Sequence, residues 1–333
     1  MADWGRSTIL ADGSYGVASN AGALRPTESF ARNHIIFLSC LILSFGLYWS
    51  SLRAWARLSI GNYEYSHLIL IPLASGLLIY WEKQRIFAHI QKGGRAISVI
   101  LMMAAAVLYL AGWRHWVGSA LADHVSIMML SLVLAWLGAF LACYGTRSFR
   151  TAAFPLLFLL LMIPLPSFLL SRIVVGLQDG SAVVTQMIFK LVGLPSYRSG
   201  LIFALPGFRI RIATECSGIR SSMALLITAL LASHFFLSTY WKKAFLIAFI
   251  VPLVVVKNAL RIATLSLLSV YVNRGFLTGN LHHYGGIPFS IISVGILLPV
   301  LWCLQKSETA ANPLKTVYLT ETGLSSDAPT PRK

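Results

Sequence analysis

The run KAFLIAFIVPLVVVKNALRIATLSLLSVYV, residues 243–272, decides the fold of this chain. It is longer than the ~20 apolar residues that a helix needs to cross a hydrocarbon layer about 30 Å thick. Blocks of similar character recur along the sequence, and most charged residues lie between them. Of 333 residues, 57% are apolar and 11% are charged, whereas roughly a quarter are charged in a soluble domain. These features predict an all-α integral membrane protein.

The sequence predicts about eight transmembrane helices. Their approximate bounds are 34–52, 66–82, 96–113, 124–143, 152–170, 216–238, 243–272 and 284–304. Prolines interrupt the second and fifth of these, and in a membrane only neighbouring protein groups can replace the hydrogen bonds that proline removes. We expect residues 34–305 to form one membrane domain, residues 1–33 to form a flexible tail, and residues 306–333 to form a disordered tail.

The positions of Lys and Arg in the short connectors predict the orientation, because cytoplasmic loops carry an excess of both. With a cytoplasmic N-terminus, eight basic residues fall inside and three fall outside. The inside set is Lys83, Arg85, Lys92, Arg95, Arg147, Arg150, Lys242 and Lys243, and the outside set is Arg53, Arg57 and Arg114. We therefore expect both termini on the cytoplasmic side of the membrane.

The long connector 171–215 then falls outside the cell. Its first part, 172–192, has apolar residues at helical spacing broken by polar ones such as Gln178 and Asp179, which is typical of a helix lying at the membrane interface. Its second part, 193–214, alternates turn signals with short β-prone runs. We expect a small β-hairpin there.

The net charge of +16 does not indicate nucleic-acid binding, because the basic residues form no stripe or arm. They are placed to contact anionic lipid headgroups. The four cysteines have no metal-ligand spacing, so we expect no metal, no cofactor and no disulfide framework. Cys40, Cys143 and Cys303 fit the role of small hydrophobic side chains.

Polar residues stand out at three places after residue 200. Cys216 follows Glu215 at the start of the sixth predicted span. Asn258 and Arg261 lie three residues apart, and therefore on one helical face. His282 and His283 precede the eighth span. In the predicted topology all three places reach the outer side of the membrane.

These residue types together suit thiol acyl transfer. A cysteine near a helix N-terminus and a cation ionises more readily. A histidine, His282 or His283, can take the thiol proton and return it to a leaving amine. Arg261 can hold the oxyanion of a tetrahedral intermediate. Arg220, one turn after Cys216, competes for that role or serves as an interfacial anchor.

The chain resembles the exosortase/archaeosortase family at three signature blocks in the same order. These are TECSGIRS at 214–221, NALRI at 258–262 and HHYGG at 282–286, with further likeness in YSHLILIP at 65–72, FPLLF at 154–158 and IPLP at 163–166. The resemblance extends from about residue 35 to residue 304. It implies a polytopic cysteine transpeptidase that cleaves C-terminal sorting signals of exported proteins.

In this resemblance Cys216 matches the nucleophile, Arg261 the oxyanion arginine and His282 the proton-transfer residue, because the family spacing is His-x-x-x-Gly. His283 keeps that last assignment open, and so does the role of His67. The implied substrate has a Pro-Glu-Pro-type motif, one transmembrane helix and a basic end. Water or an acceptor amine, such as one on a lipid or glycan, would resolve the acyl-enzyme.

Two other functions fit parts of the sequence. A polytopic transporter or flippase for polysaccharide or lipid intermediates would use Arg261 to bind an anionic headgroup, and it would tolerate replacement of Cys216. An intramembrane serine protease would use Ser217 or Ser221, although Glu215 stands where the GxSG pattern requires glycine.

Overall fold

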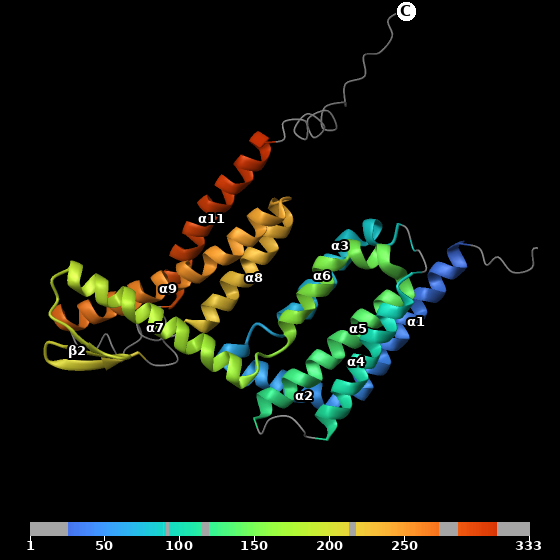
Figure 1. Cartoon of the computed structure of the whole chain (residues 1–333), viewed down its shortest axis with the longest axis horizontal. Helices are drawn as coiled ribbons and strands as arrows, with labels where there is room; N and C mark the ends of the chain where they lie inside the picture. The colour runs from blue at the N-terminus through green and yellow to red at the C-terminus, as the bar shows by residue number, and fades with distance from the viewer. Residues whose placement is uncertain are drawn as a thin grey trace, which may run out of the picture.

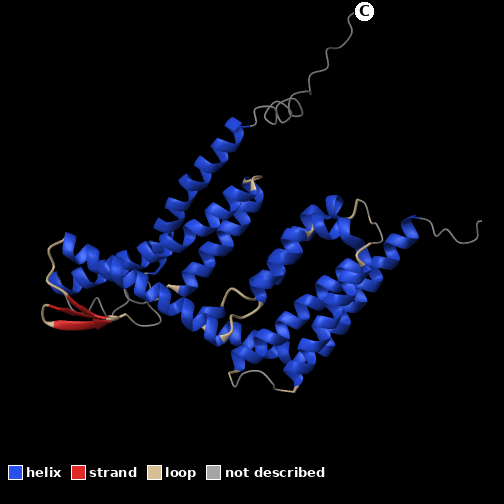
Figure 2. Ribbon diagram, viewed as in Figure 1, coloured by secondary structure: helices blue, strands red, loops and turns tan. Residues whose placement is uncertain are grey.

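The computed structural model describes residues 26–88, 90, 93–114, 120–212, 218–272 and 286–311. The described chain is mostly helical, with one small sheet (Figure 2). Six of its helices are long and apolar enough to cross a membrane, or seven if one bent pair counts as a span. The all-α membrane fold is therefore confirmed, whereas the predicted total of about eight spans is not confirmed in the described ranges.

The N-terminal part of the fold contains six α-helices and two short 3₁₀ helices. They are α1 (Pro26–Leu47), α2 (Trp49–Gly61), η1 (Tyr63–Tyr65), α3 (Leu70–Ile86), α4 (Arg95–Trp113), α5 (Leu121–Thr151), α6 (Ala153–Phe158) and η2 (Leu159–Met162). Helix α5 is central, because 67% of its apolar window is buried. Phe140 and Tyr144 of α5 are among the largest fully buried side chains of the core around it.

The predicted first span, 34–52, is not one straight helix, because it contains the bend between α1 and α2. Helices α1 and α2 meet at 75°, and α1 already begins at Pro26, inside the segment predicted to be a tail. Tyr48 stands at the bend with 3% of its surface exposed, and its hydroxyl lies 2.6 Å from Ser131 Oγ of α5. This contact holds the bend against the centre of the fold.

The predicted fifth span, 152–170, is not one continuous helix. The chain runs from α6 through η2 into a non-helical stretch, 163–166, before the next helix begins. The prolines cause this break because they cannot donate backbone hydrogen bonds.

Side chains from other elements satisfy the backbone carbonyls that the break leaves open. Trp55 Nε1 donates to Met162 O at 2.8 Å, and Ser126 Oγ donates to Pro164 O at 2.7 Å. Inside a membrane such carbonyls need protein partners, since water does not reach them. Hydrogen bonds from side chains of α2 and α5 therefore stabilise the break.

The C-terminal part comprises α7 (Ser167–Leu191), β1 (Tyr197–Ser199), β2 (Ile202–Leu205), β3 (Phe208–Arg211), α8 (Ile219–Phe236), α9 (Tyr240–Tyr271) and α11 (Gly286–Ala311). Helix α9 packs against α7, α8 and α11 (Figure 1). The strands form an antiparallel sheet in the order β1-β2-β3, so the predicted hairpin has a third strand. Helix α7, predicted to lie at the interface, is also long and apolar enough to cross a membrane.

Two sets of polar contacts join the ends of α3, α8 and α11 and the connector before α9. At the ends of α3 and α8, Glu82 Oε1 and His234 Nε2 lie 2.8 Å apart and are hydrogen-bonded. Glu308 of α11 accepts hydrogen bonds from the backbone amides of Ser238 and Thr239, directly before α9. The ends of α3, α8 and α11, which are predicted to face the cytoplasm, therefore lie together, and the sheet packs elsewhere, against the C-terminal parts of α7 and α9.

Candidate functional site

Four of the predicted site residues, Glu215, Cys216, His282 and His283, lie outside the described residues. The structure does describe the chain on either side of the cysteine, up to Ile212 and from Gly218 onward. It also describes Arg220, Asn258 and Arg261. The site can therefore be built from the elements that flank the cysteine.

Gly218 brings the start of α8 directly onto α9. It is the N-cap of α8 and has a left-handed backbone conformation, with φ of 72°. A Cβ placed on it would lie 3.4 Å from Asn258 Oδ1 and 3.6 Å from Lys257 Nζ. Cys216 precedes Gly218 by two residues, and two residues of extended chain span at most about 7 Å. Two of the three predicted blocks are therefore adjacent in space.

Asn258 is buried between α9 and α7. Only 1% of its surface is exposed, and its Nδ2 donates to Ser181 Oγ of α7 at 3.2 Å. Arg261 follows on the same face of α9 and is partly buried, whereas Arg220 in the first turn of α8 is exposed. Of the two arginines considered for the oxyanion, Arg261 is thus the one that lies within the helix bundle.

Lys257 belongs to the same cluster and was not among the site residues predicted from the sequence. Its side chain is only 6% exposed, and its Nζ donates a hydrogen bond to Ser221 Oγ in the first turn of α8. A signal was present, since a lysine inside an apolar run is costly and indicates a functional or paired side chain, as it does for Arg261.

The positive end of α8 and the Lys257 ammonium converge where the described chain resumes after the cysteine. Helix N-termini carry partial positive charge, and it adds to that of a nearby ammonium. Such a place favours an anion, for example a thiolate or the oxyanion of a tetrahedral intermediate.

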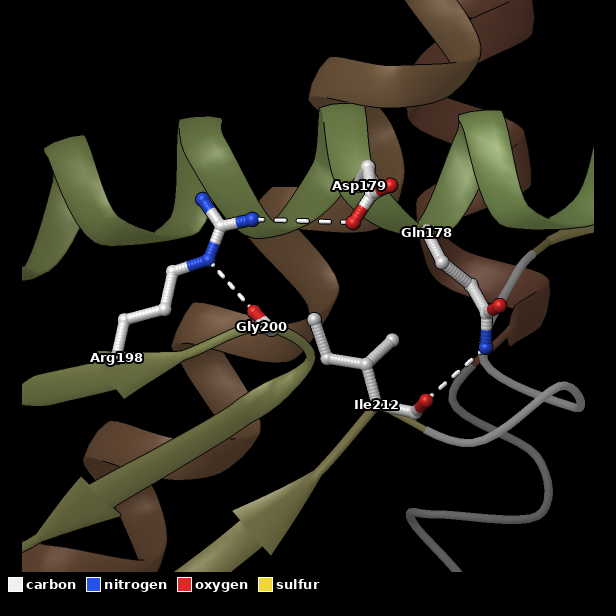
Figure 3. Close-up of polar contacts among 5 residues, drawn as sticks. All are labelled: Gln178, Asp179, Arg198, Gly200 and Ile212. Carbon is white, nitrogen blue, oxygen red and sulfur yellow. Dashed lines mark hydrogen bonds and ion pairs between the residues drawn. The ribbon is translucent and has the colours of Figure 1, made fainter.

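The other flank of the cysteine segment is fixed to α7 by polar contacts (Figure 3). Gln178, 4% exposed, donates from Nε2 to Ile212 O at 3.0 Å. Arg198 of β1 lies 3.9 Å from the Asp179 carboxylate, and its Nε donates to Gly200 O at 2.8 Å. The polar residues that interrupt the apolar pattern of α7 thus hold the sheet and the residue before the undescribed segment 213–217.

A cavity of about 80 Å³ lies against the first turn of α8. Ile219 and Met223 of α8 line one side, and Glu64 and His67 supply polar groups from the segment between α2 and α3. Burial lowers the pKa of His67, which lies in the turn before α3 and outside the candidate spans. The structure therefore places His67, whose role the sequence left open, near the residues that follow Cys216.

No group of three or more histidine, cysteine, aspartate or glutamate side chains in the described part of the chain could hold a metal ion. The chemistry available in the cluster is that of cations, amides and hydroxyls beside the cysteine segment.

Comparison with known proteins agrees with the geometry. Residues 49–299, about three quarters of the chain, match the family model described as transmembrane exosortase. No curated protein and no solved structure matches the chain. The family match includes all three sequence blocks and the helices that bring the first two together, and the resemblance seen in the sequence is confirmed. The chain belongs to the transmembrane exosortase family and is a multi-pass membrane protein.

Proposed function

We propose that this protein is a membrane cysteine transpeptidase that cleaves the C-terminal sorting signals of exported proteins. The observation that supports it most is the contact of Gly218 with Asn258 and Lys257. This contact places the end of the cysteine block against the arginine-bearing face of α9. Membership of the exosortase family supports the same activity.

The proposed reaction begins when the transmembrane helix of the substrate docks laterally from the bilayer. The thiolate of Cys216 attacks the scissile carbonyl, and Arg261 stabilises the resulting oxyanion. His282 or His283 accepts the thiol proton and gives it to the leaving amine. The C–N bond breaks, the helical tail departs, and the exported domain remains as a thioester on Cys216.

Water or an acceptor amine then attacks the thioester, and the Cys216 thiol is regenerated. An acceptor amine on a lipid or glycan would leave the exported protein attached to that molecule. The active site faces the outer side of the bacterial inner membrane in this proposal, because the substrate motif emerges there.

Replacement of the proposed nucleophile tests this function. A reporter carrying a Pro-Glu-Pro-type motif, a transmembrane helix and a basic end is expected to stay uncleaved with Cys216→Ala. Cys40→Ala, Cys143→Ala and Cys303→Ala serve as matched controls and should cleave it normally. Cleavage of the reporter by a folded, inserted Cys216→Ala protein would refute the proposal.

The thioester can be detected separately. Hydroxylamine attacks a thioester and releases the acyl group as a hydroxamate. We expect mass spectrometry to find a hydroxamate at the new C-terminus of the reporter, and only with an intact Cys216. Direct hydrolysis without an acyl-enzyme would give a free carboxylate at every hydroxylamine concentration.

One contact favours a second candidate, a serine nucleophile. Lys257 donates to Ser221 Oγ, and a lysine beside a serine can act as its general base. The Ser221 hydroxyl also donates to Gly218 O at 2.9 Å, so its proton is already engaged within α8. Ser221→Ala separates the candidates, because it abolishes cleavage only if serine is the nucleophile.

A further inference from the structure

The cavity of about 80 Å³ lies where three separate segments of the chain meet. Its walls come from the segment between α2 and α3, from the broken stretch after α6, and from the first turns of α8. His67, Leu165 and Ile219 each stand near the end of a predicted span, and the predicted topology puts these three ends on the outer side. The cavity is therefore expected on the side of the membrane where the proposed reaction takes place.

The lining of this cavity is mostly apolar. The polar side chains among the described lining residues are Glu64, Tyr65 and His67, and none of these residues is a lysine or an arginine. The Tyr65 hydroxyl donates to Leu165 O at 3.4 Å, and the imidazole of His67 is hydrogen-bonded to the Glu64 backbone. An apolar group is favoured in such a place. A carboxylate is disfavoured, because the lining would desolvate it and Glu64 would repel it.

The volume of the cavity limits its occupant to a few carbon atoms. An apolar protein cavity of about 150 Å³ holds a benzene molecule. At about 80 Å³, this cavity suits a group of roughly half that size, about three carbons. The ring methylenes of proline are such a group, and proline has no backbone N–H that would need a partner inside an apolar cavity. Of the residue types in a Pro-Glu-Pro-type motif, proline therefore fits in both size and polarity.

We propose that this cavity is the subsite that receives one proline ring of the sorting motif. This inference rests on the proposed function in taking such a motif as the substrate, but it uses none of the proposed catalytic residues. It assigns recognition of the motif to the segment before α3, the break after α6 and the start of α8. It also gives His67 a place in the wall of a substrate subsite.

The test measures binding of the motif without cleavage. The probe is a fluorescent reporter with a Pro-Glu-Pro-type motif, a transmembrane helix and a basic end, and the parent is the full chain with Cys216→Ala in lipid nanodiscs. Met223→Phe places a ring against the cavity and should displace the proline. Each buried methylene changes affinity roughly fourfold, so Kd should rise by about tenfold or more. Met187→Phe makes the same substitution at a position of α7 that is 57% exposed, and it should bind the reporter as the parent does.

Variants of the reporter identify the proline that enters the cavity. Alanine in place of one of the two prolines should weaken binding to the parent by about tenfold. The same replacement should add little to the effect of Met223→Phe, because both changes remove the same contact. Leu161→Ala enlarges the cavity and should bind a reporter with leucine at that position more tightly than the parent does. If Leu161→Ala fails to fold, Leu161→Val should shift the preference in the same direction.

Three outcomes would overturn the proposal. Unchanged affinity for the reporter in a folded Met223→Phe protein would show that the motif does not enter the cavity. Additive effects of Met223→Phe and of the proline replacement would place the ring elsewhere. An equal loss of affinity in Met187→Phe would show that the effect is not local to the cavity.

Failure of the proposed function gives a different pattern. The reporter would then bind with the predicted dependence on the cavity, but the protein with an intact Cys216 would leave it uncleaved. A reporter that does not bind the parent at all would contradict both this inference and the proposed function.

Discussion

Gly218 lies directly against Asn258, because a Cβ added to the glycine would be 3.4 Å from the amide oxygen of the asparagine. The contact joins the end of the cysteine block to the arginine-bearing block of α9. It also depends on a backbone conformation that most residues avoid, since Gly218 has φ of 72°. The proposed site therefore needs glycine at this position for its conformation more than for its size.

The effect of each substitution at Gly218 should depend on how much free energy the new residue needs to adopt the left-handed conformation. In the left-handed region alanine costs about 1–2 kcal/mol, whereas asparagine adopts this region more readily. The new Cβ would meet its neighbours at ordinary contact distances, so no clash adds to that cost. We expect the thermal midpoint in detergent and the reporter cleavage rate to fall in the order Gly, Asn, Ala.

Gly176→Ala is the control for this series. Apart from the neighbouring residues and backbone of its own helix, no atom lies within 4 Å of a Cβ at Gly176 in α7, and alanine stabilises a helix interior by roughly 0.5–1 kcal/mol relative to glycine. It should raise the thermal midpoint. Equal midpoints for Gly218→Ala and the parent would contradict the argument from strain.

Much of the fold could be predicted from hydropathy alone. The predicted bounds of the apolar runs that became α4 and α9 lie within about three residues of the observed ones, whereas α5 continues to Thr151 and α11 to Ala311, beyond the predicted ends at 143 and 304. The bend between α1 and α2 could not be predicted in this way, because a tertiary contact from Tyr48 to α5 holds it in place. The break after η2 was signalled by its prolines, but the side chains that satisfy its carbonyls come from distant elements.

The sequence could predict those site residues whose side-chain type alone indicates a chemical role. Arg261 stood out as a charge in an apolar run, and in the structure it is partly buried on α9, on the same face as Asn258. Lys257 lies in the same run, but its place in the cluster depends on its proximity to Ser221 and Gly218. These two residues approach it only because α8 packs against α9. Gln178 likewise acquires a role only when the sheet folds back onto α7.

Substitution of the buried Ser126 tests the hydrogen bonds at the proline break. Ser126 Oγ lies 2.7 Å from both Ala122 O and Pro164 O. Ser126→Ala leaves the second carbonyl without that donor, and interhelical hydrogen bonds in a membrane protein contribute about 0.6 kcal/mol on average and at most about 1.7. We expect a lower midpoint of unfolding in a detergent titration.

The matched control for Ser126 is Ser269, which is also buried and donates at 2.7 Å to a carbonyl four residues earlier, Leu265 O. That bond lies within its own helix, where such a contact adds little stability. Ser269→Ala should therefore change the midpoint less than Ser126→Ala. An equal loss from both would mean that the bond to Pro164 contributes nothing.

The oxyanion role proposed for Arg261 should require the guanidinium group and not only a positive charge. Lysine at this position keeps the charge but lacks the planar fork that holds an oxyanion in a fixed geometry. Removal of one oxyanion donor typically lowers kcat by about 10²–10³-fold. We expect Arg261→Lys to slow reporter cleavage by roughly that factor while alkylation of Cys216 by iodoacetamide stays fast. Normal cleavage by Arg261→Lys would exclude the oxyanion role.

The two histidines before the last helix should differ. If His282 transfers the proton, His282→Ala lowers the cleavage rate by about 10²–10⁴-fold, the usual contribution of general acid–base catalysis. His283→Ala, made separately, should keep most of the activity. Reporter cleavage measured between pH 5 and 9 checks this, because only loss of the proton-transfer residue changes the shape of the profile. Equal activity in both variants would remove histidine from the proposed mechanism.

His67 should make stability depend on pH below neutrality. Burial lowers its pKa in the folded protein below the ordinary value of 6.5, and a hydrogen bond with the Glu64 backbone opposes this only in part. At pH values more than about one unit above 6.5 the imidazole is neutral in both states and contributes nothing to the pH dependence, whereas at pH 6.5 half of the unfolded chains carry the proton. As the pH falls from 6.5 towards the lowered pKa, the unfolded chain gains a proton that the folded protein does not, so the free energy of unfolding decreases. The thermal midpoint of the parent should therefore fall more steeply than that of His67→Gln over this window, since the other histidines titrate in both proteins. Parallel curves for the two proteins would show that His67 is not buried beside α8 as a neutral side chain.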